Sequence, residues 1–107
     1  MQTRAKALYV APLGNRVGLT TVCMGLVRAL DRVGIRVGFC KPIAQLFAGD
    51  TGPERSTHLI RHTTDLNPPE PLDFDEAQVM AGSGKINDLM EQILSAFDEA
   101  TGEADVV

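Results

Sequence analysis

A glycine-rich turn near the start of the chain has the residue types and spacing of a phosphate-binding loop. The turn runs from Gly14 to Gly18, and two hydroxyl residues follow it where a helix is expected to begin. Successive backbone N–H groups at such a turn form a concave anion site, and the helix dipole favours negative charge there. The residues predicted to contact a phosphate or an effector are Gly14, Asn15, Arg16, Val17, Gly18, Thr20 and Thr21.

This turn lacks the lysine that a nucleotide-hydrolysing loop places directly after its last glycine. Leu19 occupies that position, where a Walker loop uses lysine to reach the β- and γ-phosphates. Since a hydrogen bond to a charged group contributes about 1.5–3 kcal/mol, its loss would weaken triphosphate binding roughly ten- to a hundredfold. Thr20 lies where a Mg²⁺-binding hydroxyl is usual, but the missing lysine argues against nucleotide or Mg²⁺ as a resident cofactor. Three interpretations stay open: nucleotide hydrolysis, binding of a phosphorylated or nucleotide-like effector, and a structural relic.

Other reactive residue types form weaker patterns. His58 and His62 stand four residues apart and could share a helix face as zinc ligands do. No other histidine is present, so two surface histidines are the preferred interpretation and no metal site is expected. Cys23 and Cys40 fall in expected core elements without metal-ligand spacing, which indicates reduced thiols and a cytoplasmic protein. Ser83 does not lie in a nucleophile elbow, so we expect no catalytic residue.

Apolar periodicity predicts the elements that position the turn. Residues 7–11 are an apolar run typical of a buried parallel strand, and residues 20–33 carry an apolar stripe at helical spacing. Gly34 can end that helix, and residues 35–40 are rich in strand-forming types. A strand, a helix and a strand over this length predict a right-handed, parallel βαβ unit.

The second half of the chain is predicted to be mainly helical. A short helix is expected from Pro53 to about His62, and a second one, capped by Asp73 or Asp75, to about residue 81. Residues 67–71, NPPEP, cannot form regular structure. Residues 85–100 have a clear amphipathic pattern closed by Gly102. The final residues 104–107, ADVV, are typical of the first residues of another buried strand that is cut off.

Charge is distributed unevenly along a chain of 107 residues with a net charge of −4. Residues 1–62 hold 9 basic and 3 acidic residues, a net of +6, and residues 63–107 hold 1 basic and 11 acidic residues, a net of −10. The basic half contains the loop, which suits a small anionic ligand. Nucleic acid is not expected, because the whole chain is acidic and lacks a basic aromatic face. No stretch approaches the roughly 18 apolar residues of a membrane span.

The loop and the segment KPIAQ at residues 41–45, at this spacing, resemble the opening of long-form bacterial phosphate acetyltransferases. That region of the family is a P-loop domain similar to dethiobiotin synthetase. The resemblance covers nearly the whole chain. It implies an α/β fold with a three-layer, P-loop-like parallel sheet and flanking helices, truncated here at the start of its third strand. Residues 1–107 would then be a partial amino-terminal domain, with the acetyltransferase domain outside this chain.

The resemblance also carries over two site positions. In dethiobiotin synthetases the lysine of the K-P motif reaches toward the phosphates, and Lys41 matches it; the alternative is a solvated lysine at a strand end. Arg16 is a further candidate cation. The metal-binding acidic residue of those enzymes aligns approximately with Ser56, with Asp50 and Glu54 nearby but shifted in position. A metal ligand therefore looks lost, as well as the loop lysine.

The expected function is a non-catalytic region that regulates a phosphate acetyltransferase or stabilises its oligomer. The expected partners are a small anionic metabolite or nucleotide, the rest of the parent enzyme and further copies in a homo-oligomer, without membrane or nucleic acid. Two alternatives remain: an ATP-dependent ligase of the dethiobiotin synthetase type, and an assembly module with an empty phosphate loop.

Overall fold

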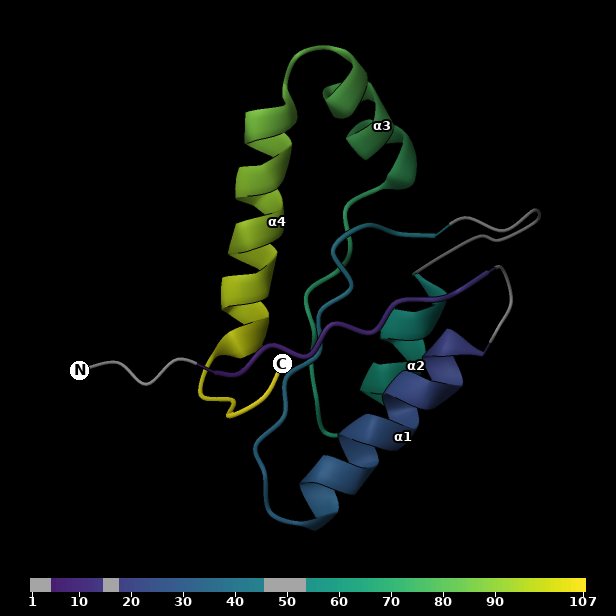
Figure 1. The fold of residues 1–107 in the computed structure, drawn as a ribbon, viewed down its shortest axis with the longest axis vertical. Coiled ribbons are helices and arrows are strands. Elements are labelled where there is room, and N and C mark those ends of the chain that lie inside the picture. Colours follow the sequence, from purple (N-terminus) through teal and green to yellow (C-terminus); the bar gives the residue numbers. More distant parts are fainter. Residues whose placement is uncertain (1–4, 15–17, 46–53) are drawn as a thin grey trace.

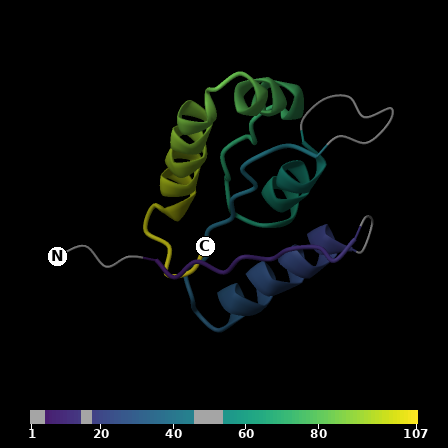
Figure 2. The same ribbon diagram turned by 45° about the horizontal axis from the view of Figure 1, so that its top comes forward.

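Four α-helices and several extended segments make up the described part of the computed structural model, which comprises residues 5–14, 18–45 and 54–107 (Figure 1). The helices are α1 (Leu19–Arg32), α2 (Arg55–Thr63), α3 (Phe74–Gly82) and α4 (Ile86–Thr101). Figures 1 and 2 show α1 and α2 toward one end of the molecule and α3 and α4 toward the other. The extended segments cross the space between these two pairs.

Isolated parallel bridges connect the extended segments. Val106 pairs with both Lys6 and Val37, and Ile43 pairs with Leu72. The segment 105–107 therefore lies between segments 6–8 and 36–38, although these are far apart in sequence. The parallel direction agrees with the expected βαβ unit. The described residues contain no continuous strand, however, so the three-layer sheet stays a prediction.

The first apolar run is more exposed to solvent than the sequence predicts. Residues 7–11 were expected to be a buried strand, but the Leu8 and Tyr9 side chains are 53% and 89% exposed. Hydrogen bonds at this segment join its backbone to residues 105–107, with the Leu8 N–H donating to the Val107 carbonyl over 2.8 Å. These bonds satisfy the backbone without covering the side chains. The prediction of burial is therefore wrong for this segment.

The boundaries of α1 follow from glycine conformation. Gly18 is the N-cap and has φ +81°, a left-handed conformation that other residues rarely adopt. The Gly34 N–H donates to the Asp31 carbonyl over 3.0 Å at the other end. The helix expected over residues 20–33 is thus confirmed, with each boundary shifted by one residue.

Side-chain caps define the starts of the next two helices. Glu54 caps α2, so the helix begins at Arg55 rather than at Pro53, which lies outside the described residues. Asp73, rather than Asp75, caps α3 by accepting a hydrogen bond from the Glu76 N–H over 3.1 Å. The amphipathic helix predicted over residues 85–100 is confirmed as α4, which Gly102 follows.

The core of the described part is small and uses one residue from each helix. The buried hydrophobic residues are Val27, Ile60, Ala77 and Leu89. Helices α3 and α4 pack against each other. None of the helices in the described ranges is long and apolar enough to cross a bilayer.

Candidate functional site

The predicted loop residues lie at the start of α1, where the structure describes them. Gly14 is exposed at a bend, Gly18 is the N-cap, and Thr20 and Thr21 belong to the first turn of the helix. Asn15, Arg16 and Val17 lie outside the described residues, so their predicted role stays untested. No acidic side chain lies in this first turn and no side chain caps it at Gly18. The helix dipole at this end is therefore not offset by a carboxylate of the first turn.

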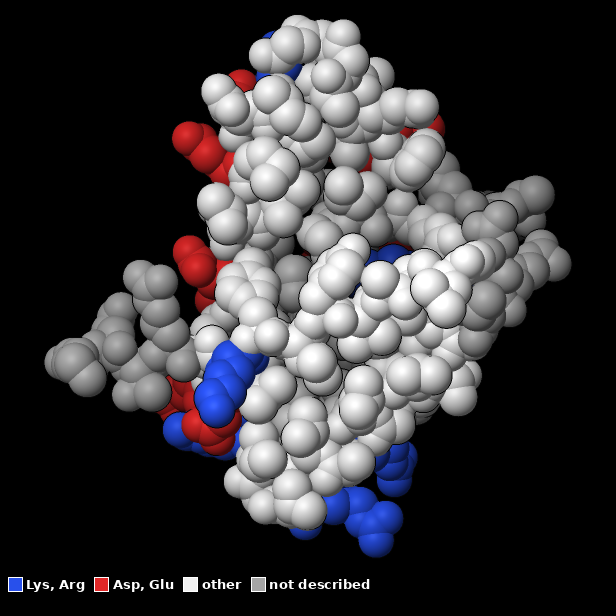
Figure 3. Space-filling view, viewed as in Figure 1, with Lys and Arg blue, Asp and Glu red and all other residues white. Residues whose placement is uncertain are grey.

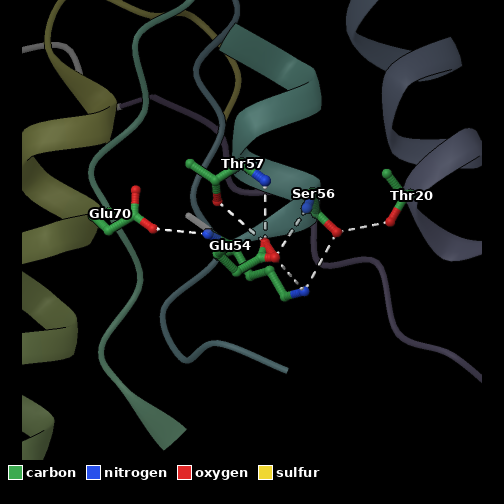
Figure 4. A network of polar contacts seen from close by, with 6 residues as sticks. Thr20, Glu54, Ser56, Thr57 and Glu70 are labelled. Atoms are coloured by element: carbon green, nitrogen blue, oxygen red, sulfur yellow. Dashed lines mark hydrogen bonds and ion pairs between the residues drawn. The ribbon is translucent and has the colours of Figure 1, made fainter. Parts of the chain in front are cut away.

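A polar network joins this end of α1 to the start of α2. The Thr20 and Ser56 hydroxyl oxygens lie 2.7 Å apart and share a hydrogen bond. The Lys41 ammonium donates to the Ser56 hydroxyl and to a Glu54 carboxylate oxygen, both over 3.3 Å. Figure 4 shows the Ser56 hydroxyl directed toward that of Thr20. Two predicted site residues, Thr20 and Lys41, are thus brought together through a third side chain.

Glu54, which the sequence analysis placed near the site but not in it, is a central residue of this network. Its side chain is only 4% exposed and that of Lys41 is 20% exposed. The carboxylate also accepts hydrogen bonds from the Ser56 N–H over 2.9 Å and the Thr57 N–H over 3.1 Å. It therefore satisfies the first N–H groups of α2 and pairs with the lysine at the same time.

The side chain of Lys41 is only 20% exposed and its ammonium pairs with Glu54, so it is not the solvated lysine of one interpretation. Its approach to a phosphate stays a prediction. Sequence alignment assigned Ser56 to an acidic position and treated the nearby carboxylate as displaced. The position of Glu54 directly before α2 could have indicated its role. A glutamate at the N-cap can fold back over the start of the helix and so lie beside a residue two positions later.

Glu70 extends the network toward the NPPEP segment. One of its oxygens accepts a hydrogen bond from the Glu54 N–H over 3.1 Å, and the other accepts one from the Arg61 guanidinium over 2.9 Å. Arg61 also donates to the Pro68 carbonyl over 2.6 Å. These contacts fix the chain before α2 against the residues that follow it, which holds the carboxylate of Glu54 in place (Figure 4).

Comparison with known proteins assigns the chain to a family. A family profile described as an AAA domain matches residues 6–107. The chain belongs to this family. The assignment indicates a P-loop type of fold for this AAA domain, in agreement with the helix that begins directly after Gly18.

Known relatives of this AAA domain include phosphate acetyltransferases. The chain is 48% identical to that of Pseudomonas aeruginosa over 99 residues, or 92% of the chain. It is 45% identical to that of Pseudomonas putida over 102 residues and 33% identical to that of Escherichia coli over 104 residues. The resemblance inferred from the loop and KPIAQ is confirmed. The matches span only 14% or 15% of the length of these relatives.

The remaining candidate residues of the AAA domain do not form a metal centre in the described part. The rings of His58 and His62 lie with centroids 4.2 Å apart on the exposed face of α2. No group of three or more potential metal-ligating side chains occurs among the described residues. The exposure of both histidine side chains agrees with the surface interpretation.

Both cysteines of the AAA domain are free thiols. Partial burial raises the pKa of the Cys23 thiol, and the positive charge of Lys41 opposes this effect. Burial also raises the pKa of Cys40, with a further contribution from the carboxylate of Glu99. A raised pKa keeps these thiols protonated at neutral pH, which makes them poor nucleophiles.

Proposed function

We propose that this AAA domain is a non-catalytic amino-terminal region of a phosphate acetyltransferase. The whole enzyme would interconvert acetyl-CoA and phosphate with acetyl phosphate and CoA, using residues outside this chain. Relatives that are 33% to 48% identical support the parent enzyme. The observation that carries the non-catalytic role is Leu19 at the first position of α1, where a phosphate loop needs its lysine.

Its role would be to bind a small phosphorylated effector at the start of α1. The left-handed Gly18 turn and the first backbone N–H groups of α1 supply hydrogen-bond donors for an anion. Lys41 supplies a positive charge on the adjacent segment, linked to Thr20 through Ser56. No resident metal or nucleotide is needed for this role.

The same proposal includes the parallel sheet and the cellular setting of the protein. The isolated parallel bridges around Val106 are the pairing that a three-layer parallel sheet with flanking helices would extend. The protein would work in the cytoplasm as part of a homo-oligomer.

Assembly is the second candidate function, and exposed apolar side chains favour it. Helix α4 presents three half-exposed residues at four-residue spacing: Ile86 (48%), Met90 (48%) and Leu94 (59%). Figure 3 shows acidic side chains along the edge of the molecule where α4 lies, several basic side chains at the lower end, and a broad surface without charged side chains. Exposed apolar side chains that share one helix face are typical of contact regions.

Calorimetric titration of the purified chain separates these functions. Orthophosphate should bind, and Lys41→Met should weaken that binding, whereas the matched control Lys6→Met should not. Micromolar, Mg²⁺-dependent binding of ATP would instead favour the ligase of the dethiobiotin synthetase type. Absence of phosphate binding, together with loss of the oligomer when the region is deleted from the full-length enzyme, would favour the assembly module.

An activity assay tests the non-catalytic role. The purified 107-residue chain should form no acetyl phosphate from acetyl-CoA and phosphate. Robust formation of acetyl phosphate by this chain would contradict the proposal.

A further inference from the structure

We propose that Glu54 is an internal counter-ion that makes the Lys41 site selective for doubly charged phosphoryl groups over carboxylates. This inference rests on the proposed function and specifies the ligand class of the same site. It follows from the geometry around the amine, in which a carboxylate of the protein itself already pairs with the ammonium.

The contacts of the Lys41 ammonium show how Glu54 pairs with it. Its ammonium has two acceptors among the described residues, the Glu54 carboxylate and the Ser56 hydroxyl, each at 3.3 Å. Both partners of the ion pair are largely buried. A buried ion pair carries no net charge, so a free anion approaching it gains little attraction unless the pair separates.

The carboxylate also resembles a bound anion in its other contacts. It receives the Ser56 and Thr57 N–H groups at the start of α2, an arrangement in which helices bind phosphates and carboxylates. A ligand that carries one negative charge offers the amine no more than Glu54 already does. Glu54 repels a phosphoryl dianion as well, but the dianion offers more acceptor oxygens, which can bond the amine and a neighbouring donor together, so it can compete for the amine better than a carboxylate can.

The Ser56 hydroxyl links this competition to α1. It accepts from the amine and shares a hydrogen bond with Thr20 in the first turn of the helix. An anion bound at the start of α1 would therefore interact with the Lys41 amine through the Ser56 hydroxyl. The Lys41–Glu54 pair is therefore connected to the start of α1 through the Ser56 side chain.

Removal of the charge, with retention of the helix cap, tests the proposal. Glu54→Ser keeps a residue type favoured at the N-cap, and Glu54→Gln keeps the length of the side chain, so at least one variant should fold. Orthophosphate and acetate are titrated at low ionic strength and followed by calorimetry. Because one charged hydrogen-bond partner of the amine is vacated, the affinity for phosphate should rise by roughly ten- to a hundredfold and acetate binding should become measurable.

The matched control is Asp73→Ser, which exchanges an acidic N-cap for serine at α3, where the carboxylate accepts the Glu76 N–H. Its affinities should equal those of the unmodified chain. Unchanged phosphate and acetate affinities in both Glu54 variants, with phosphate bound by the unmodified chain, would overturn the inference and leave the proposed function standing.

A second measurement tests the ion pair without any effector. Competitive acetylation with trace acetic anhydride, read by mass spectrometry, gives the rate at Lys41 relative to Lys6 and Lys85 in the same molecule. Both Glu54 variants should raise this relative rate severalfold, and Asp73→Ser should not change it. A raised rate without phosphate binding in any variant would support the ion pair but overturn the effector site and, with it, the selectivity. An unchanged rate would overturn the counter-ion role of Glu54.

Discussion

The hydroxyl groups of Thr20 and Ser56 share a hydrogen bond of 2.7 Å that joins the first turn of α1 to the first turn of α2. This bond connects the phosphate-loop helix to the helix that holds the Lys41 partners. The two helices start at positions far apart in the chain. The bond is a direct side-chain link between their first turns at the candidate site.

A double-mutant cycle should detect this contact. Thr20→Val and Ser56→Ala should each lower the free energy of unfolding by about 0.5–1.5 kcal/mol, and the double variant should lose less than the sum of both. Urea unfolding measures these values. In the control cycle, Ser56→Ala is combined with Thr101→Val, whose hydroxyl donates within α4 to the Phe97 carbonyl. Additive losses in the first cycle would contradict a direct contact.

Gly38 should not tolerate a side chain. A Cβ atom built at this position would overlap the Ala100 carbonyl oxygen, and it would lie 3.4 Å from a Val107 methyl group. Gly38→Ala should therefore lower the free energy of unfolding by about 1–3 kcal/mol, as overpacking does. Gly25→Ala is the control, because its Cβ meets open space within α1 and alanine favours helix. Equal stability of the two variants would show that segment 36–38 does not approach the end of α4 so closely.

The Arg36–Asp105 ion pair should make stability depend on acid pH. Hydrogen bonds from Arg36 lower the pKa of the Asp105 carboxyl below its ordinary value of 3.8. The contribution of this group is therefore present above pH 3.8 and is lost as the pH falls through the lowered pKa. Unfolding curves recorded at pH 5 and at lower pH should show a smaller loss of stability in Asp105→Asn than in the unmodified chain.

The partner variant checks the cause of that dependence. Arg36→Met removes the guanidinium that donates to Asp105 over 3.0 Å, so it should reduce the acid-dependent loss in the same direction. Both side chains are exposed, and added salt should weaken the effect further. An Arg36→Met variant with the full acid dependence would assign that dependence to other carboxyl groups.

The two thiols should react slowly in the folded protein. Burial raises the pKa of Cys23 and of Cys40, and the thiolate is the reactive form. Alkylation by iodoacetamide at pH 8 should therefore be several times slower than that of free cysteine, and urea should remove the difference. Lys41→Met should slow Cys23 further, because the positive charge of Lys41 favours the thiolate. Equal rates for folded and unfolded protein would contradict the burial of both thiols.

Helices were more predictable from the sequence than the extended segments. Leu89 and its neighbours repeat at helical spacing, and residues such as Gly18, Asp73 and Gly102 mark boundaries by local chemistry. The exposure of Leu8 and Tyr9 was not predictable, because it depends on which distant segments cover them. An apolar run predicts that a residue can be buried, while the tertiary arrangement decides whether it is.

The candidate site was predictable in its parts and not in its connections. The left-handed Gly18 and the helix after it follow from the loop motif, and Lys41 follows from family resemblance. Motif alignment could not predict that Lys41 is buried against Glu54. The carboxylate comes from the N-cap of α2 rather than from the position that aligns with the acidic residue of dethiobiotin synthetases. A motif specifies a position in sequence, whereas an ion pair depends only on where two side chains meet.

The double pairing of Val106 has a consequence for the order of events during biosynthesis. Segments 6–8 and 36–38 both hydrogen-bond to residues 105–107, and among the described residues no bridge joins these two segments directly. While a ribosome makes the chain, helix α1 can form early from local contacts, but the first extended segment has to wait for residue 106 to emerge. The backbone of residues 6–8 therefore stays unpaired in the nascent polypeptide until residues 105–107 have been made, and in that interval a chaperone would find it accessible.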